Sequence, residues 1–384
     1  MSELIITSGR SSWFRRELLT TVSSIALIVS VGKAQADDGI RQNNVWIELG
    51  GQVEHNSNWE EPLAPSFASG IADLGFTSPA SLEHSPGYSF GGYAKVSISA
   101  PETDWTFSAS IRYGRGSLNR HSHEEGDTFR NTAIYPTKTK YQTAVAVNFA
   151  DTKVLNVETH AIADFQAGKD VGLGLFGPGG RSLVSLGVRF AQFTSRERSE
   201  IKSDQDVGAN KYLTIPSIVS HLAVHSNYRS FAAEFDATRS FRGVGPSISW
   251  DASKDVMGND DRGAISVDWG ANASVLFGRQ KTTEEHSGLS VYRQKMFTQF
   301  HNYRAPIVSS ATSAPPRQSR SHSVVVPNVG AFAGLSFRYP NAKVSFGYRA
   351  DFFFGAMDGG IDTRKTYDRN FYGPYASVSI GLGG

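Results

Sequence analysis

The sequence has 384 residues, no cysteine, 38 glycines and a formal net charge of +2, and 39% of its residues are hydrophobic. The absence of cysteine excludes a disulfide-stapled scaffold. The hydrophobic content is low for a helical membrane protein, but it is ordinary for a β-barrel in which every second residue faces water.

Residues 1–36 have the pattern of a cleaved export signal. A basic start that includes Arg15 precedes a moderately apolar run over residues 18–31, and a small-residue cleavage site ends at Ala36. An uncleaved membrane anchor is the alternative, but the apolar run is short for a span. Cleavage would leave residues 37–384 as a single, formally neutral domain, which argues against nucleic acid as a partner.

The chain then alternates apolar and polar residues, beginning with a strand predicted over 43–53. A period of two is the signature of a β-strand whose two faces meet different environments. The next segment, 89–113, reads as a hairpin with its turn at 100–104. Residues 140–168 fit either one strand or a hairpin, and residues 183–193 fit one further strand.

The alternation continues in the second half of the chain but changes phase once. Phe235 and Phe241 place odd-numbered positions on the outer face, whereas Ile248 places even-numbered positions there. A β-bulge at the glycines of 242–246 would produce this change, because a bulge adds one unpaired residue to a strand. A long, regular alternation over 265–277 follows.

The most regular hairpin spans residues 329–354 with a turn at 340–342, and a last strand is predicted over 374–382. The hairpin strands have about the length that a tilted strand needs to cross a bilayer. Their apolar faces end in aromatic residues, as the interfacial girdles of outer-membrane barrels do.

Turns and loops alternate in length along the chain. Short turns are predicted at 100–104, 169–181, 253–262 and 340–342. Long loops are predicted at 54–87, 114–139, 194–228, 281–323 and 355–368. Short periplasmic turns and long extracellular loops are typical of outer-membrane barrels. The predicted fold class is therefore all-β: a transmembrane, antiparallel, up-and-down β-barrel with an even number of strands, about 10–14.

Charged residues on the predicted inner faces are the main functional candidates. In an open barrel such residues line a water-filled pore and tune its selectivity. In a closed barrel they pair across strands and fill the lumen, and Arg349 and Asp351 are close enough on one face to pair. The predicted pore-lining set is Glu48, Lys95, Arg112, Asp164, Arg189, Glu234, Asp236, Asp268, Arg338, Arg349 and Asp351.

Other candidate sites are weaker. His121, His123, Glu124 and Asp127 could gather a metal ion, but solvated loops often have this composition, and no metal or other cofactor is predicted. No serine has the sequence context of a catalytic nucleophile, so an enzyme is not expected. Residues 213–225 are unusually apolar for a loop and either narrow the channel mouth or extend a strand at the rim.

Several short, glycine-centred motifs occur in order within residues 181–384: SLGVRFAQF, FRGVGPSISWDAS, WGANASVLFGRQ, VPNVGAFAGLSFRY, VSFGYRADFF and FYGPYASVSIGL. Together they resemble the Legionella-type major outer membrane protein family. The resemblance implies a pore-forming β-barrel in a Gram-negative outer membrane. The cysteines of that family are absent here, so the resemblance does not imply a disulfide-linked envelope network.

The sequence as a whole predicts an outer-membrane porin through which small hydrophilic solutes and ions diffuse passively. Its expected partners are outer-membrane lipids, the barrel-assembly machinery and those solutes, with homo-oligomerisation left open. The alternative is a non-conducting barrel that acts as an adhesin or a structural envelope protein through its long loops. Whether the lumen is open or filled distinguishes the two hypotheses.

Overall fold

A computed structural model describes residues 45–56, 88–100, 103–133, 141–171, 180–208, 224–259, 263–297, 307–361 and 365–382, all within the compact unit Asn43–Gly384. The predicted export signal and residues 213–223 lie outside the described residues. The strands are β1 (Val45–Asn56), β2 (Tyr88–Ser99), β3 (Trp105–Ala133), β4 (Tyr141–Asp170), β5 (Gly180–Gly208), β6 (Val224–Asn259), β7 (Gly263–Phe297), β8 (Ile307–Ser313), β9 (Gln318–Tyr339), β10 (Ala342–Asp358) and β11 (Thr366–Leu382). The described residues include no helix long and apolar enough to span a membrane.

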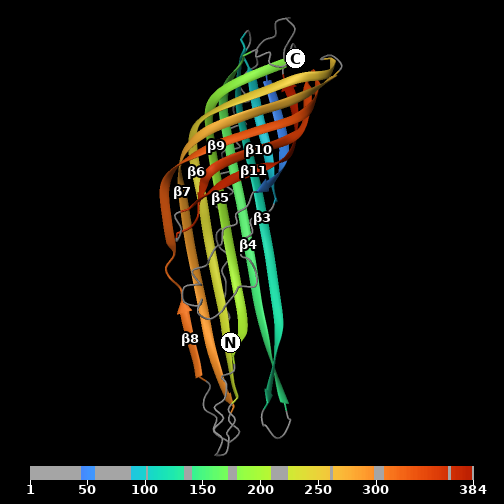
Figure 1. Ribbon diagram of the computed structural model, residues 1–384. Helices are drawn as coiled ribbons and strands as arrows, with labels where there is room; N and C mark the ends of the chain where they lie inside the picture. Colours follow the sequence, from blue (N-terminus) through green and yellow to red (C-terminus); the bar gives the residue numbers. More distant parts are fainter. Residues whose placement is uncertain are drawn as a thin grey trace, which may run out of the picture. The chain divides into compact units, whose positions relative to one another are not determined.

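Ten of these strands close into an antiparallel, up-and-down barrel (Figure 1). Each strand pairs with the next along the chain from β1 to β7, β7 pairs with β9, and β11 pairs back with β1. The remaining strand, β8, pairs with β7 outside this ring. The predicted fold class is confirmed with a strand number at the lower end of the expected range. Of the ambiguous segment 140–168, residues 141–168 belong to the single strand β4.

Alternate residues of each barrel strand face the lumen and the exterior, as the period of two predicts. On β10, Ser345 and Asp351 are buried on the lumen side, whereas Phe346 and Tyr348 are about half exposed on the outside. Register with the neighbouring strands is continuous through this region, since Phe346 lies opposite Leu335 of β9. The barrel therefore has a polar inner surface and an apolar outer surface.

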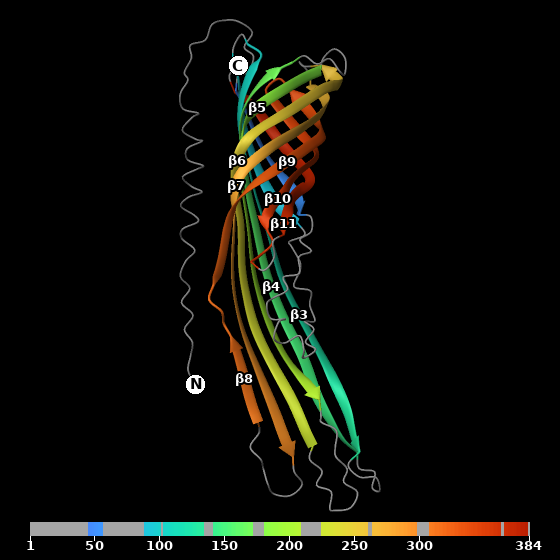
Figure 2. The same cartoon turned by 60° about the vertical axis from the view of Figure 1, so that its left-hand side comes forward.

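Four strands, β3 and β5 to β7, are longer than the sequence predicts, and together with β4 they continue beyond the ring as an open sheet (Figures 1 and 2). β3 and β4 stay paired as far as Ala133 and Tyr141. In contrast, the pairing of β2 with β3 ends at Phe90 and Arg115. We call the part of β3–β7 beyond the ring, together with β8, the sheet extension.

Most of the residues in three predicted loops are therefore in strands. Residues 114–139 belong largely to β3, and residues 194–228 and 281–323 are divided among the ends of β5 to β9. The sequence predicts loops in these segments because they are rich in polar residues. A strand outside the barrel needs no apolar face toward lipid, so polarity alone did not exclude strand structure there.

β6 is regular where a bulge was predicted. Its register with β5 and β7 is the same on both sides of residues 242–246, and the nearest shift lies between Asp255 and Met257. Phe241 is fully buried inside the barrel and Val244 is 49% exposed outside it, so odd-numbered positions face inward throughout. The prediction was wrong because it assumed that the aromatic residues of β6 face outward.

The turn between β6 and β7 depends on glycine geometry. Gly258 has a φ of +100°, and a Cβ placed on it would lie 2.2 Å from the carbonyl oxygen of Gly263. We expect Gly258→Ala to lower the free energy of unfolding by about 1–3 kcal/mol, the range for a strained backbone conformation. Denaturant unfolding in detergent micelles, followed by tryptophan fluorescence, measures this change.

Gly288→Ala is the matched control, because Gly288 lies on β7 and an added Cβ would meet nothing within 4 Å. The unfolding midpoint of this variant should equal or slightly exceed that of the wild type, since alanine loses less backbone entropy on folding than glycine. Equal losses in the two variants would contradict the assignment of strain to Gly258.

Candidate functional site

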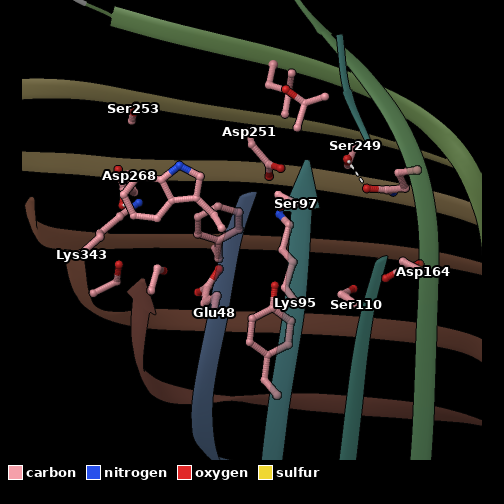
Figure 3. Close-up of a pocket in the computed structure, with 18 of the residues that line it drawn as sticks. Glu48, Lys95, Ser97, Ser110, Asp164, Ser249, Asp251, Ser253, Asp268 and Lys343 are labelled. Carbon is pink, nitrogen blue, oxygen red and sulfur yellow. Dashed lines mark hydrogen bonds and ion pairs between the residues drawn. The ribbon is translucent and has the colours of Figure 1, made fainter. Parts of the chain in front are cut away.

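The short-turn half of the lumen holds a cavity of about 560 Å³, which we call the polar cavity. Figure 3 shows Glu48, Lys95, Asp251, Asp268 and Lys343 around this space, on strands from different sides of the ring. Nζ of Lys343 lies 2.6 Å from Oδ2 of Asp268. Glu48 accepts a hydrogen bond of 2.7 Å from the hydroxyl of a β11 serine. Both signs of charge line the cavity, so it has no evident ion preference.

Next to the polar cavity, a group of charged and amide side chains spans the lumen. We call it the ion-pair layer: Arg112, Asp164, Arg189, Asn272, Asn328 and Asp351. Its first bridge joins β3 to β10, where Nη1 of Arg112 lies 2.6 Å from Oδ2 of Asp351 and the two side chains are 8% and 3% exposed. Three strands separate β3 from β10 around the ring. The ion pair therefore crosses the interior.

The second bridge of the ion-pair layer is centred on Arg189 of β5. Its guanidinium donates to both carboxylate oxygens of Asp164 on β4, at 2.6 and 3.0 Å. It also donates to the amide oxygen of Asn272 on β7 at 2.7 Å and to that of Asn328 on β9. One arginine thus connects four strands, and these hydrogen bonds all go to protein groups.

Arg349 does not form the predicted ion pair with Asp351, because Asp351 bonds to Arg112 of β3. The guanidinium carbon of Arg349 lies 5.0 Å from the ring centroid of Tyr93, 5.1 Å from that of Tyr375 and 5.7 Å from that of Phe332. Guanidinium groups stack favourably on aromatic faces. This cluster holds Arg349 against the barrel wall beside the polar cavity.

Beyond the ion-pair layer, the lumen is filled by apolar side chains. We call this cluster the apolar plug: Ile162, Ala191, Phe193, Phe241, Leu276, Val326, Phe353, Ala356, Met357 and Phe371. The ring centroid of Phe193 lies 4.8 Å from that of Phe353, 5.6 Å from that of Phe371 and 5.7 Å from that of Phe241. These rings come from β5, β6, β10 and β11, so they meet in the interior of the ring.

The end of β10 bends inward over the apolar plug. A register shift lies between Phe353 and Met357, and residues 356–360 are buried. Arg320 of β9 bonds to the carboxylate of Asp358 and donates to the carbonyl oxygen of Ile361 at 3.3 Å. The sequence predicts residues 355–361 as the start of the long loop 355–368. They form instead an inward segment that covers the plug on the side of the sheet extension.

Most of the predicted pore-lining residues lie on the inner surface of the barrel. Glu48, Lys95, Arg112, Asp164, Arg189, Asp268, Arg338, Arg349 and Asp351 all line the polar cavity. Two do not: Glu234 and Asp236 are exposed on the outer face of β6, while the adjacent Phe235 is buried. This correction has the same cause as the absent bulge, because reversing the phase of β6 exchanges its two faces.

Several inner residues were missed from the sequence. Lys343 follows the phase of β10 and could have been found by extending the alternation back to the turn. Glu158 on β4 and Arg369 on β11 form a nearly buried ion pair of 2.7 Å at the level of the apolar plug. Glu158 shares its phase with Asp164 on the same strand, so extending that alternation backward would have found it. Arg369 lies between the predicted loop 355–368 and the strand predicted over 374–382, so the sequence predicts no phase for it. The apolar plug had no signal at all, because aromatic residues were assigned to the outer face.

The histidine-rich stretch lies on β3 in the sheet extension. His121 bonds to Asp151 of β4 and His123 lies 3.9 Å from the same carboxylate. The His121 ring holds the pKa of Asp151 below its usual value. The side chains of Glu124 and Asp127 lie outside the described part. Among the side chains that are described, no three histidine or carboxylate groups are placed to hold a metal ion.

The outside of the ring carries a band of exposed apolar side chains. It includes Phe107 and Phe165 at 52% and 59% exposure, Leu186 at 64% and Leu335 at 52%. A band of this kind, about 25 Å tall, is the lipid-facing surface of an outer-membrane barrel. The apolar band is continuous along β7, where no outward-facing residue between Ile265 and Phe277 is charged.

Comparison with known proteins adds little to this picture. No family model and no curated protein matches the chain. Among solved structures, the transport unit of the Escherichia coli autotransporter AIDA-I is 7% identical, with 94% of this chain and 97% of that chain covered and a TM-score of 0.17. OmpT of Vibrio cholerae is 10% identical, with 90% and 99% covered and a TM-score of 0.14. The P. putida toluene transporter TodX is 9% identical, with 90% and 91% covered and a TM-score of 0.16. The fold is assigned from the strand register of the chain itself.

Proposed function

We propose that this protein is a non-conducting outer-membrane barrel that acts as a surface-binding or structural protein of the envelope. The observation that carries the proposal is the filled lumen. The ion-pair layer and the apolar plug lie in series along the barrel, and the plug includes buried aromatic rings from four strands. The polar side chains Glu158 and Arg369, at the level of the plug, are nearly buried and paired with each other, so we expect that a hydrated ion cannot pass.

The membrane location is supported by the outer surface of the ring. Its apolar band has the character required for contact with lipid, and the closed ring leaves no unpaired strand edge within it. The short turns at one end and the sheet extension at the other match the periplasmic and external sides of outer-membrane barrels. Export would use the predicted signal in residues 1–36, and insertion would use the barrel-assembly machinery.

The sheet extension supports a role at the cell surface. Its outer face is charged and polar, with exposed residues such as Arg198, Lys202 and Asp236. The edge of β3 beyond Arg115 has no paired strand on its β2 side among the described residues. Sheet edges of this kind are used for recognition by strand addition, so a partner would meet a polar sheet and not an apolar groove.

Single-channel recording tests the proposal. We expect the refolded mature chain, inserted into planar bilayers, to produce no stepwise conductance, because the apolar plug blocks the water path. A heat-modifiability gel shows that the inserted protein is folded, and an open general-diffusion porin reconstituted in parallel shows that the bilayers report channels.

Stable conductance steps would contradict this proposal and favour the second candidate, a porin for small hydrophilic solutes. The observation that favours a porin is the polar cavity of about 560 Å³ with its mixed charges. In that case Asp268→Asn, inside the cavity, should change ion selectivity, whereas the matched variant Asp236→Asn, on the outer face of β6, should not.

A further inference from the structure

One part of the outer surface changes abruptly from apolar to cationic. On β5, β6, β7 and β9, the residues Phe190, Val244, Phe277 and Val325 lie opposite one another in a single row. They are 40%, 49%, 58% and 53% exposed. This row ends the apolar band on the side of the sheet extension, since the next outward residues on these strands are polar or charged.

The adjoining positions hold three exposed basic residues, which we call the cationic cluster: Arg242, Arg279 and Lys281. Arg242 of β6 and Arg279 of β7 lie directly opposite each other, and Lys281 is the next outward residue on β7. Like charges that face each other across two strands destabilise a sheet. The arrangement is therefore unfavourable unless an anion lies between them.

No described carboxylate provides that anion. The cationic cluster takes part in no ion pair among the described residues, and the nearest outward carboxylate along β7, that of Glu285, is four positions beyond Lys281. The neighbours across the strands are hydroxyl groups: Ser323 lies opposite Arg279, and Ser321 lies opposite Lys281. Nε of Arg279 donates to the hydroxyl of Ser321 at 2.7 Å, which leaves the other guanidinium donors available.

We infer that the cationic cluster binds the phosphate group of a phosphorylated lipid in the outer leaflet. Paired guanidinium groups match phosphate oxygens through bidentate, charge-assisted hydrogen bonds. The acyl chains of the same lipid would lie along the row of Val244, Phe277 and Val325. A soluble anion would use the charges alone, whereas a lipid explains the charges and the exposed apolar row together. The inference rests on the membrane orientation given under the proposed function but not on whether the barrel conducts.

Lipid binding in detergent micelles tests this inference, with diphosphoryl lipid A and enzymatically dephosphorylated lipid A as probes. We expect the wild type to bind the phosphorylated probe at least about tenfold more tightly, as hydrogen bonds to charged groups allow. In Arg242→Gln/Arg279→Gln this preference should be lost. Raising the salt concentration should weaken wild-type binding of the phosphorylated probe, which provides a second measurement if the variant folds poorly.

The matched control is Arg198→Gln/Lys202→Gln, which removes two exposed charges from the outer face of β5. Arg198 lies opposite Asp236, and Lys202 pairs with Glu200. This double variant should retain the wild-type preference for the phosphorylated probe. Equal binding of the two probes by the wild type, or equal losses in both double variants, would overturn the inference. Competition by inorganic phosphate as strong as that by the phosphorylated lipid would also overturn it, because the site would then take a free anion.

Discussion

Replacing Asp351 by alanine is expected to lower the free energy of unfolding by about 3–5 kcal/mol, the usual loss when one partner of a buried ion pair is removed. Asp351 and Arg112 are 3% and 8% exposed and 2.6 Å apart. Without the carboxylate, the guanidinium of Arg112 would stay in the lumen with its charge uncompensated. Urea unfolding in detergent micelles, followed by the heat-modifiable band and by fluorescence, gives the measurement.

Two further variants make this prediction specific. Arg112→Met/Asp351→Leu should recover most of the loss, because replacing both partners by apolar groups leaves no unpaired charge in the lumen. Asp236→Ala removes an exposed carboxylate from the outer face of β6 and should change stability by no more than about 0.5 kcal/mol. If Asp351→Ala were as stable as Asp236→Ala, the interior would be wet enough to solvate Arg112, and the lumen would not be closed.

The second large effect is expected at the centre of the apolar plug. Phe193 is 1% exposed and its ring contacts those of Phe241, Phe353 and Phe371. Phe193→Ala should lower the free energy of unfolding by about 3–5 kcal/mol, because it removes buried apolar contacts and leaves a cavity that three fixed rings cannot fill. The same denaturant titration measures it.

Phe165→Ala provides the comparison, since Phe165 lies on the outer face of β4 and is 59% exposed. Truncation there leaves no internal cavity, because detergent or lipid fills the space, so the loss should be less than half of that for Phe193→Ala. Similar losses at the two positions would show that the plug is loosely packed. Partial opening of the lumen in Phe193→Ala would appear as flickering conductance in the bilayer assay.

The barrel itself could be predicted from the sequence because lipid outside and water inside impose a period of two on every strand. The hairpin over 329–354 is an example: its apolar residues Leu335 and Phe346 lie opposite each other on the outer surface, with Arg338 and Asp351 on the inner one. The turns at 100–104 and 340–342 were located for the same reason, since the alternation stops at each of them, whereas residues 253–259 of the turn predicted at 253–262 belong to β6. Most of the turn predicted at 169–181 lies outside the described residues.

The filling of the lumen could not be predicted in this way. Arg112 and Asp351 are 239 positions apart in the chain, and alternation assigns each of them a face but not a partner. The apolar plug contradicts the alternation rule directly, because Phe193, Phe241 and Phe353 are aromatic residues on the inner face. Placing Phe241 outside forced a bulge into β6 and put Glu234 and Asp236 inside. The sheet extension was missed because its outward positions are polar, so its strands lack the lipid-facing apolar residues that mark the barrel strands, although Val154, Ile201 and Phe235 are buried on the opposite face.

The seam of the barrel has a consequence for how the protein folds. Nearly all strand pairs join neighbours along the chain, but β1 pairs with β11, so contacts such as that between Glu48 and Ser377 connect residues 329 positions apart. Contacts of long sequence separation carry a large loop-closure entropy and form slowly. Hairpins can therefore assemble early, whereas ring closure waits for the last strand to be made and brought to the first. Until then the polar and aromatic groups of the interior would face one another across an open sheet, and closure of the seam would complete the ion-pair layer and the apolar plug in the same step.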